Sequence, residues 1–367
     1  MNGSKGSALT PVLSVYLDLV RFGAAVVVVL SHAWPVLVPG HDLPWPGHQA
    51  VVVFFVLSGL VIAHASTRPG LVAGEYAIHR AARIWSVAIP ALLLSLLATA
   101  AIGTAGQLDA PSVEGRFGAI PNLILNAVFA GQLWFADVQP PFDSAYWSLN
   151  YEVWYYCLFG AWFFLRGRTR VLTIAVVAAV AGPKILLLLP IWVLGVVLYR
   201  HQPALSERVA LLIFLASAGL ALLFVGLGAG IEVRHALWPY WSGPLRVLGG
   251  SNEFLTDWLF GLIVAANFAA AARLGRYGDI LLRFTSPIRA AAGHTFSAYL
   301  YHQPLLAFIV LVAGWRHWTG LLLVALGVAI LAQCTEKQLP AVRRFLHAAA
   351  SRFGVIAPAS PLKRASG

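Results

Sequence analysis

The sequence predicts an all-α fold, a polytopic transmembrane helical bundle of about ten spans with both termini cytoplasmic, and three observations lead to this prediction. Hydrophobic runs of about 20 residues, the length at which a helix crosses a bilayer, recur from one end of the chain to the other. Of the 367 residues, 59% are hydrophobic and only 11% are charged, whereas a soluble domain is about 25% charged. Arginines collect in alternate links between the runs, which is typical of cytoplasmic loops.

Eleven hydrophobic runs are candidate spans. They cover residues 12–34, 49–66, 84–103, 119–136, 147–166, 171–182, 184–200, 208–230, 256–274, 293–314 and 318–338. If 119–136 crossed the membrane, the arginine cluster at 166–170 would lie on the opposite side from Arg80 and Arg83. We therefore expect 119–136 to be an interfacial or re-entrant segment, which leaves ten spans.

The domain organisation that follows is simple. A single transmembrane domain, residues 12–340, lies between an N-terminal tail, 1–11, and a basic C-terminal tail, 341–367, both cytoplasmic. The short run 171–182 precedes a Gly-Pro pair and could be one half of a broken helix, which is tolerated where backbone lines a cavity. The chain is expected to be a multi-pass protein of the inner (plasma) membrane.

Composition also excludes some partners. The formal net charge of +11 would suggest nucleic acid for a soluble protein, but here the basic residues lie in short links beside the bilayer. We expect the lipid bilayer, not nucleic acid, to be the partner. Cys157 and Cys334 lie in hydrophobic runs without disulfide or metal-ligand spacing, so no metal is predicted. The oligomeric state is left open.

Ionisable residues inside the first span are the strongest sign of function, because charges in lipid are costly and by default mark a functional site. Eleven helical steps bring His32 back to within roughly 20° of Arg21, about 16 Å further along the axis. Asp18 lies on the same face, three residues before Arg21. The alternative is structural, since an Asp–Arg pair at this spacing can also anchor one helix to another.

Two arginines follow the second span. Arg80 and Arg83 are three residues apart, so they share one helical face beside the bilayer. They could be simple cytoplasmic anchors, or they could clamp a phosphate, because guanidinium forks match phosphate oxygens. In the second span itself, Ser58-Gly59 offers small residues against which another helix can approach closely.

Two later spans carry further polar residues. Glu152 lies one to two turns inside the span that begins with Trp147 and Ser148, and it needs a partner there. We expect it at the depth of His32, so that the two could share a polar cavity. His302 stands one turn after Tyr299 and shortly before a proline that would kink the helix. A histidine in this position either lines a polar cavity or is satisfied by a neighbour.

Together these segments resemble the membrane acyltransferase family 3, integral membrane enzymes that modify cell-surface glycans, lipids and some secondary metabolites. The matching pieces, in the family's order, are Leu17-Asp18-Leu-Val-Arg21 with His32; Phe54-Phe-Val-Leu-Ser58-Gly59; Arg80-x-x-Arg83-Ile; Trp147-Ser148-Leu149-x-x-Glu152; and Tyr299-Leu-Tyr301-His302-Gln303-Pro304. They spread over residues 12–338. The sequence departs from the family after Arg83, where a frequent proline is missing, and at Asn150-Tyr151, which replaces a small-aliphatic pair.

The resemblance implies an O-acyltransferase that moves an acyl group, most often acetyl, from cytoplasmic acyl-CoA to a hydroxyl of a surface glycan or glycolipid. A macrolide-like natural product or a glucan is the alternative acceptor. A different class, a proton-coupled transporter, also uses intramembrane charges, although the chain has no internal repeat of the kind many transporters show. A purely structural membrane protein is the third possibility.

The resemblance also implies roles for the candidate residues. His32 would be the general base, or would carry the acyl group itself, and Glu152 would orient it or bind the sugar. Arg21, positioned by Asp18, would stabilise the oxyanion or hold CoA. The remaining residues divide between donor and acceptor. Arg80 and Arg83 would hold the acyl-CoA, while Trp147, Ser148, Tyr299 and His302 would contact the acceptor.

Overall fold

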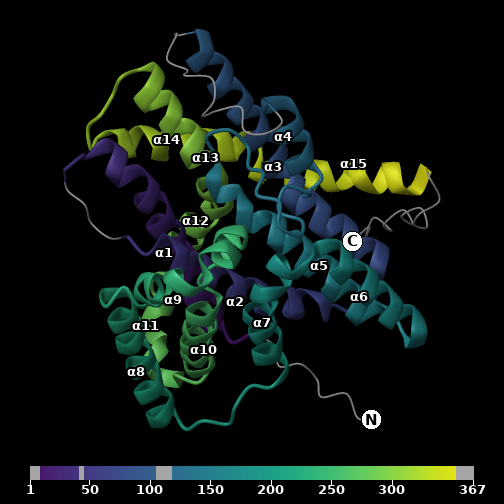
Figure 1. Cartoon of the computed structure of the whole chain (residues 1–367). Helices are drawn as coiled ribbons and strands as arrows, with labels where there is room; N and C mark the ends of the chain where they lie inside the picture. The colour runs from purple at the N-terminus through teal and green to yellow at the C-terminus, as the bar shows by residue number, and fades with distance from the viewer. Residues whose placement is uncertain (1–8, 41–44, 105–117, 353–367) are drawn as a thin grey trace, which may run out of the picture.

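The computed structural model describes residues 9–40, 45–104 and 118–352, and over these residues the chain is helical without a β-strand (Figure 1). The predicted all-α class is therefore confirmed. Eight helical segments are long and apolar enough to cross a membrane. They are α1 (Pro11–Leu37), α2 (Gly47–Ser66), α3 (Ala73–Thr104), α7 (Pro183–Arg200), α8 (Glu207–Gly226), α10 (Phe254–Ala271), α13 (Thr295–Ala307) with the π-helical η6 (Phe308–Val312), and α14 (Gly320–Cys334) with its continuation.

Two of the ten predicted spans are not among these eight. Helix α5 (Trp147–Phe164) has 18 residues but is rich in aromatic and polar side chains, and α6 (Gly167–Ala181) has only 15 residues. The predicted break after α6 is present, because Gly182 has a φ of 82°, which favours glycine, and α7 starts at Pro183. The count of ten spans and the cytoplasmic location of both termini stay predictions.

The segment 119–136 does not form a spanning helix, as its charge pattern predicted. Helix α4 (Ala119–Ala127) has nine residues and is about 13 Å long, whereas the hydrocarbon core is about 30 Å thick. The chain then folds back through turns to η3 (Ser144–Tyr146). The buried ammonium of Lys184 holds this returning segment by donating to Gln132 (2.7 Å) and to the carbonyl of Ala136.

Several segments expected to be loops or tail are helical. Helix α9 (Ala229–Val247) is kinked at Trp241, between two prolines, and η4 (Gly249–Ser251) follows it. Short helices η5 (Gly275–Gly278), α11 (Asp279–Leu282) and α12 (Thr285–Ala292) connect α10 to α13. After α14, η7 (Glu336–Gln338) leads into α15 (Leu339–Arg352), which occupies the first part of the predicted tail. The rest of both tails lies outside the described residues.

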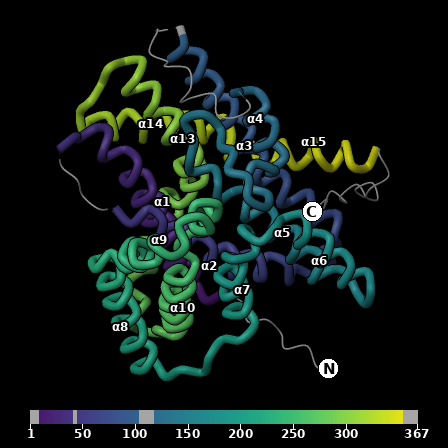
Figure 2. Tube along the Cα trace, viewed as in Figure 1, coloured from purple at the N-terminus to yellow at the C-terminus, as the bar shows by residue number. Residues whose placement is uncertain are grey.

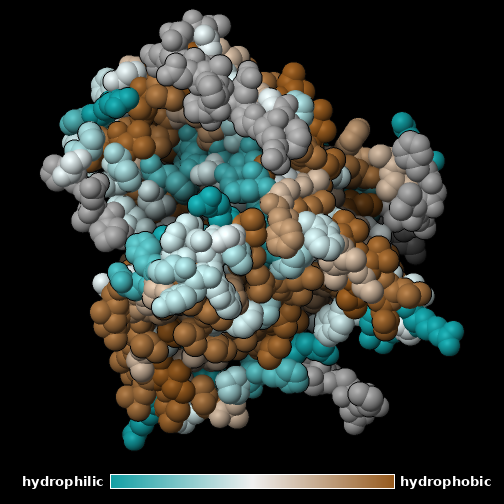
Figure 3. All heavy atoms as spheres, in the orientation of Figure 1, coloured by the Kyte–Doolittle hydropathy of each residue, from teal (hydrophilic) through white to brown (hydrophobic). Residues whose placement is uncertain are grey.

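Helices α1, α2, α7 and α13 form the centre of the bundle (Figure 2), with α3 and α5 on one side and α8 and α10 on the other. Hydrophobic side chains cover the surface over α8 and α10, and a hollow lined by hydrophilic side chains opens near α13 and α4 (Figure 3). The apolar surface suits lipid contact, and the polar hollow is where a site is expected.

The closest helix pair is α2 with α7, and glycines make its approach possible. A Cβ atom on Gly59 would overlap the carbonyl of Trp192, and one on Gly195 would overlap the carbonyl of Val56. Both carbonyl groups belong to the backbone, so they cannot move aside unless the two helices separate. The expected packing role of the Ser58-Gly59 pair is thus present in the structure.

We expect Gly59→Ala and Gly195→Ala each to lower stability by about 2 kcal/mol or more, because overpacking at a backbone contact forces the helices apart. Gly219→Ala in α8 is the matched control, since a Cβ atom there would meet nothing within 4 Å. Thermal unfolding of the purified variants in nanodiscs measures the effect. Equal melting temperatures for Gly59→Ala and Gly219→Ala would contradict this packing account.

Candidate functional site

Two cavities of several hundred Å³ lie among the described residues of the bundle. The first, which we call the histidine cavity, has a volume of about 500 Å³ and is lined by His32, Val36, Asn122, residues 137–144, Gln303, Leu306, Ala307, Val310 and Leu311. The second, which we call the arginine cavity, has a volume of about 420 Å³. Its polar lining residues are Arg21, Ser58, Arg80, Arg83, Ser148, Glu152, Tyr156, Thr295 and Tyr299.

Two helices contribute to both cavities. Along α1, Arg21 lines the arginine cavity and His32 lines the histidine cavity, so the spacing singled out in the sequence connects the two. Along α13, Tyr299 lines the arginine cavity and Gln303 lines the histidine cavity, with His302 between them. The two cavities therefore approach each other where α1 packs against α13.

The contact between α1 and α13 is a pair of histidines. Nδ1 of His32 lies 3.1 Å from Nε2 of His302, and the ring centroids are 5.1 Å apart. Nδ1 of His302 lies 2.9 Å from the carbonyl of Ala298, while Nδ1 of His32 also lies 3.0 Å from the carbonyl of Val28. His302 is buried, with an exposed fraction of 1%, and is satisfied on both nitrogens.

These contacts assign the protons of the neutral pair. A carbonyl can only accept, so Nδ1 of His302 carries a hydrogen, and Nε2 of neutral His302 is then an acceptor. His32 must donate from Nδ1, because both groups that face this nitrogen are acceptors. The remaining nitrogen of His32, Nε2, keeps its lone pair. His32 can therefore accept a proton at Nε2 while His302 fixes its tautomer and orientation.

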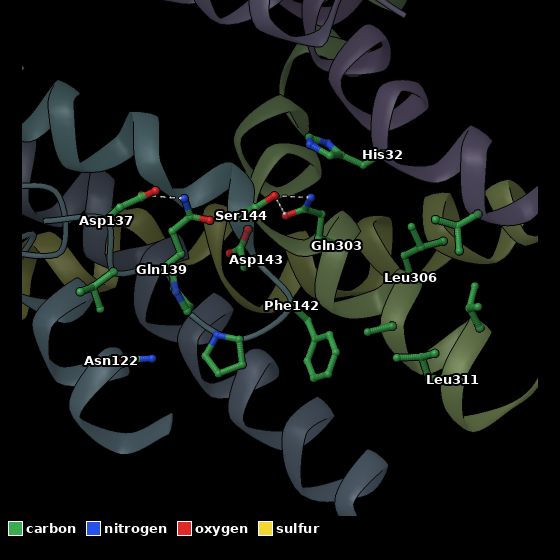
Figure 4. A pocket seen from close by; sticks show the side chains of 16 residues that line it. His32, Asn122, Asp137, Gln139, Phe142, Asp143, Ser144, Gln303, Leu306 and Leu311 are labelled. Carbon is green, nitrogen blue, oxygen red and sulfur yellow. Dashed lines mark hydrogen bonds between the residues drawn. The ribbon is translucent and has the colours of Figure 1, made fainter. Parts of the chain in front are cut away.

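The polar wall of the histidine cavity comes mainly from the segment that precedes α5 (Figure 4). Gln303 accepts a hydrogen bond from the backbone N–H of Ala145 (2.9 Å) and donates to the hydroxyl of Ser144 (2.8 Å). These two hydrogen bonds hold the segment against α13. Asp143, directly before Ser144, lies at the wall of the same cavity.

Asp143 is the least satisfied ionisable residue in this region. Its exposed fraction is 1%, and neither carboxylate oxygen has a hydrogen-bond partner among the described residues. Burial raises the pKa of Asp143 well above its usual value, and the nearby backbone N–H of Tyr146 offsets only part of this shift. The sequence analysis missed this residue. An acid in a segment of prolines and aromatics next to a span was the available signal.

Arginines dominate the arginine cavity. Arg21 pairs with Asp18 (3.2 Å), and Arg83 pairs with Glu336 (3.3 Å), which also accepts a hydrogen bond from the hydroxyl of Ser297 (2.9 Å). Nε of Arg80 is buried and has no hydrogen-bond partner among the described residues. The cavity thus holds three guanidinium groups, two of them paired with carboxylates, and its apolar wall comes mainly from α2.

Glu152 lies in the arginine cavity, not with His32, so the expectation that these two share a polar cavity is wrong. Its carboxylate accepts hydrogen bonds from the hydroxyls of Ser58 and Tyr156, the latter at 2.5 Å, and Trp192 donates to Ser58 (3.1 Å). The prediction rested on the position of Glu152 along its helix, and it failed because the hydrogen bonds to Ser58 and Tyr156 turn the side chain towards α2. Glu152 is therefore not in a position to orient the His32 ring.

The other predicted contact residues divide between the two regions. Ser148 and Tyr299 line the arginine cavity, where their hydroxyls lie 2.5 Å apart, and Tyr299 also donates to the carbonyl of Ala145 (3.0 Å). The Tyr299 ring centroid is 6.5 Å from that of His302, so this tyrosine lies at the end of the arginine cavity nearest the histidine pair. Trp147 lines neither cavity and instead stacks on His48 (6.0 Å).

Beside Trp147 lies a third ionisable cluster. His48, Glu253 and Asp257 bring potential ligand atoms within 4.8 Å of one another. However, His48 pairs with Asp257 (3.0 Å) and Glu253 pairs with Arg234 (3.1 Å). This arrangement is that of an ion-pair network joining α2, α9 and α10.

A family model described as "Acyltransferase domain" matches residues 14–334, which include all the helices that line the two cavities apart from α15. No curated protein and no solved structure matches the chain.

Proposed function

This chain belongs to the acyltransferase family 3 of integral membrane proteins, and from this premise we propose that it is an O-acyltransferase of the inner membrane. The donor in this proposal is cytoplasmic acyl-CoA, with acetyl-CoA first, and the acceptor is a hydroxyl of a surface glycan or glycolipid. The observation that supports it best is the arrangement of the two cavities: His32 lines one, and the other is lined by Tyr299, whose ring centroid is 6.5 Å from that of His302.

The arginine cavity suits the donor. Coenzyme A carries phosphates, and the guanidinium groups of Arg80 and Arg83 match phosphate oxygens. The apolar wall of the cavity would hold the pantetheine arm, which would then extend towards Ser148 and Tyr299 at the end near the histidines. Arg21, positioned by Asp18, would add charge along the same path. In this proposal Ser148 and Tyr299 therefore contact the donor and not the acceptor.

The histidine cavity suits the acceptor, and His32 is the proposed base. Its free Nε2 takes the proton of the acceptor hydroxyl while the hydroxyl oxygen attacks the thioester carbonyl carbon. When the tetrahedral intermediate collapses, the C–S bond breaks and the proton on His32 goes to the departing thiolate of CoA. General-base assistance of this kind contributes typically about 10²–10⁴-fold. His302 accepts from Nδ1 throughout, so it stabilises the charged form of His32.

We expect His32→Ala to abolish acyl transfer while the protein still folds and binds donor, because only the base is removed. His294→Ala is the matched control: its Nδ1 also faces a carbonyl four residues earlier (2.9 Å), but it lines neither cavity. Release of free thiol from acetyl-CoA by protein in nanodiscs, with an envelope extract as acceptor, measures turnover. Wild-type turnover in His32→Ala would exclude His32 as the base.

We also expect Arg80→Gln and Arg83→Gln each to raise the KM for acyl-CoA about 10-fold or more, since a hydrogen bond to a charged group contributes roughly 1.5–3 kcal/mol. The KM for acceptor should change little. Arg168→Gln, an exposed arginine at the start of α6, is the control. If the donor KM stayed at its wild-type value in both cavity variants, these arginines would be topological anchors only.

A further inference from the structure

The two cavities differ in charge, and the difference bears on the acceptor. Three arginines line the arginine cavity. No lysine or arginine is found among the described residues that line the histidine cavity. Its acidic lining residues are Asp137 and Asp143. An anion that entered the histidine cavity would lose its hydration without gaining a cationic partner there, which is strongly unfavourable.

The two acidic side chains of the histidine cavity are not equivalent. Asp137 is exposed and accepts hydrogen bonds from the amides of Gln132 (2.9 Å) and Gln139 (3.0 Å). Asp143 is buried, and its side chain accepts no hydrogen bond from the described residues. A buried polar group without a partner destabilises a protein, and at a cavity wall a bound ligand can supply the missing hydrogen bond.

We propose that the histidine cavity binds an acceptor whose acylated unit carries no negative charge, and that a hydroxyl or amino group of this unit donates a hydrogen bond to Asp143. Sugar units with a phosphate or a carboxylate are excluded. This inference rests on the proposed function, because it names the class of acceptor for the same site. Asp143 acts here as a binding residue that selects the acceptor.

The shape and chemistry of the cavity agree with such an acceptor. Its polar side presents the amides of Gln139 and Gln303 beside Asp143, and amides suit uncharged hydroxyls in both hydrogen-bond directions. Its other side, from the C-terminal half of α13 into η6, is apolar and includes Leu306 and Leu311. One face can therefore bind hydroxyls while the other packs against the C–H face of a sugar ring or an attached apolar chain.

The test uses purified protein in nanodiscs, radiolabelled acetyl-CoA and an envelope extract of the host as acceptor, followed by depolymerisation and mass spectrometry of the labelled unit. Wild-type protein should label units that are neutral or carry an amine. Label on a unit with a phosphate or carboxylate would overturn the proposal. Absence of donor turnover and of label in every extract would overturn the acyltransferase function itself, and this inference with it.

Variants separate a binding role of Asp143 from a structural one. Asp143→Ala should lower labelled product at least 10-fold, with unchanged donor binding and a melting temperature equal to or above the wild type, because an unsatisfied buried group is removed. Asp143→Asn, which keeps a polar group, should give an amount of labelled product between those of the wild type and Asp143→Ala. Asp279→Asn, an exposed carboxylate that lines neither cavity, is the control. Wild-type product from Asp143→Ala, or a clear fall in its melting temperature, would overturn the role given to Asp143.

Discussion

The hydrogen bond between His32 and His302 is the interaction on which the rest of the site depends. It joins α1 to α13 where the two cavities approach each other. The other ring nitrogen of His302, Nδ1, is already bonded to the carbonyl of Ala298 in its own helix. Because His302 can only accept from His32, the bond leaves a lone pair on Nε2 of His32. A single partly buried contact thus joins two central helices and leaves the site able to accept a proton.

Polar groups inside a membrane protein must be paired, and most of those in this bundle are. Lys184 holds the returning segment before α5, Glu152 gathers hydroxyls from α2 and α5, and Glu336 pairs with Arg83. These pairs fix the walls of the cavities. Among the ionisable side chains that line the two cavities, the described residues leave two with buried polar atoms that have no hydrogen-bond partner: Arg80 at Nε and Asp143 at its carboxyl group. These two lie where the proposed donor and acceptor bind, and unsatisfied groups of this kind are found at functional sites.

Helix period and charge pattern were sufficient for the parts of this account that depend on one segment at a time. They predicted the all-α class, the non-spanning 119–136 segment, the break at Gly182 and the common face of Arg21 and His32. Contacts between segments were out of reach. The position of Glu152 along its helix was predictable from the sequence. The direction in which its side chain points was not, and that direction decides which cavity the side chain lines. Asp143 and Glu336 were missed because burial and pairing across helices are tertiary properties. Helices α9 and α15 were missed because prolines and charges obscure their hydrophobic pattern.

The central claim is that donor and acceptor enter separate cavities and meet at His32. It is tested most directly by an experimental structure of the protein in nanodiscs with a CoA analogue whose thioester is replaced by a stable thioether. The account predicts that the phosphates lie beside Arg80 and Arg83 and that the thioether sulfur reaches the end of the arginine cavity marked by Tyr299, next to His32. A phosphate group bound in the histidine cavity, or an analogue whose sulfur points away from His32, would contradict it.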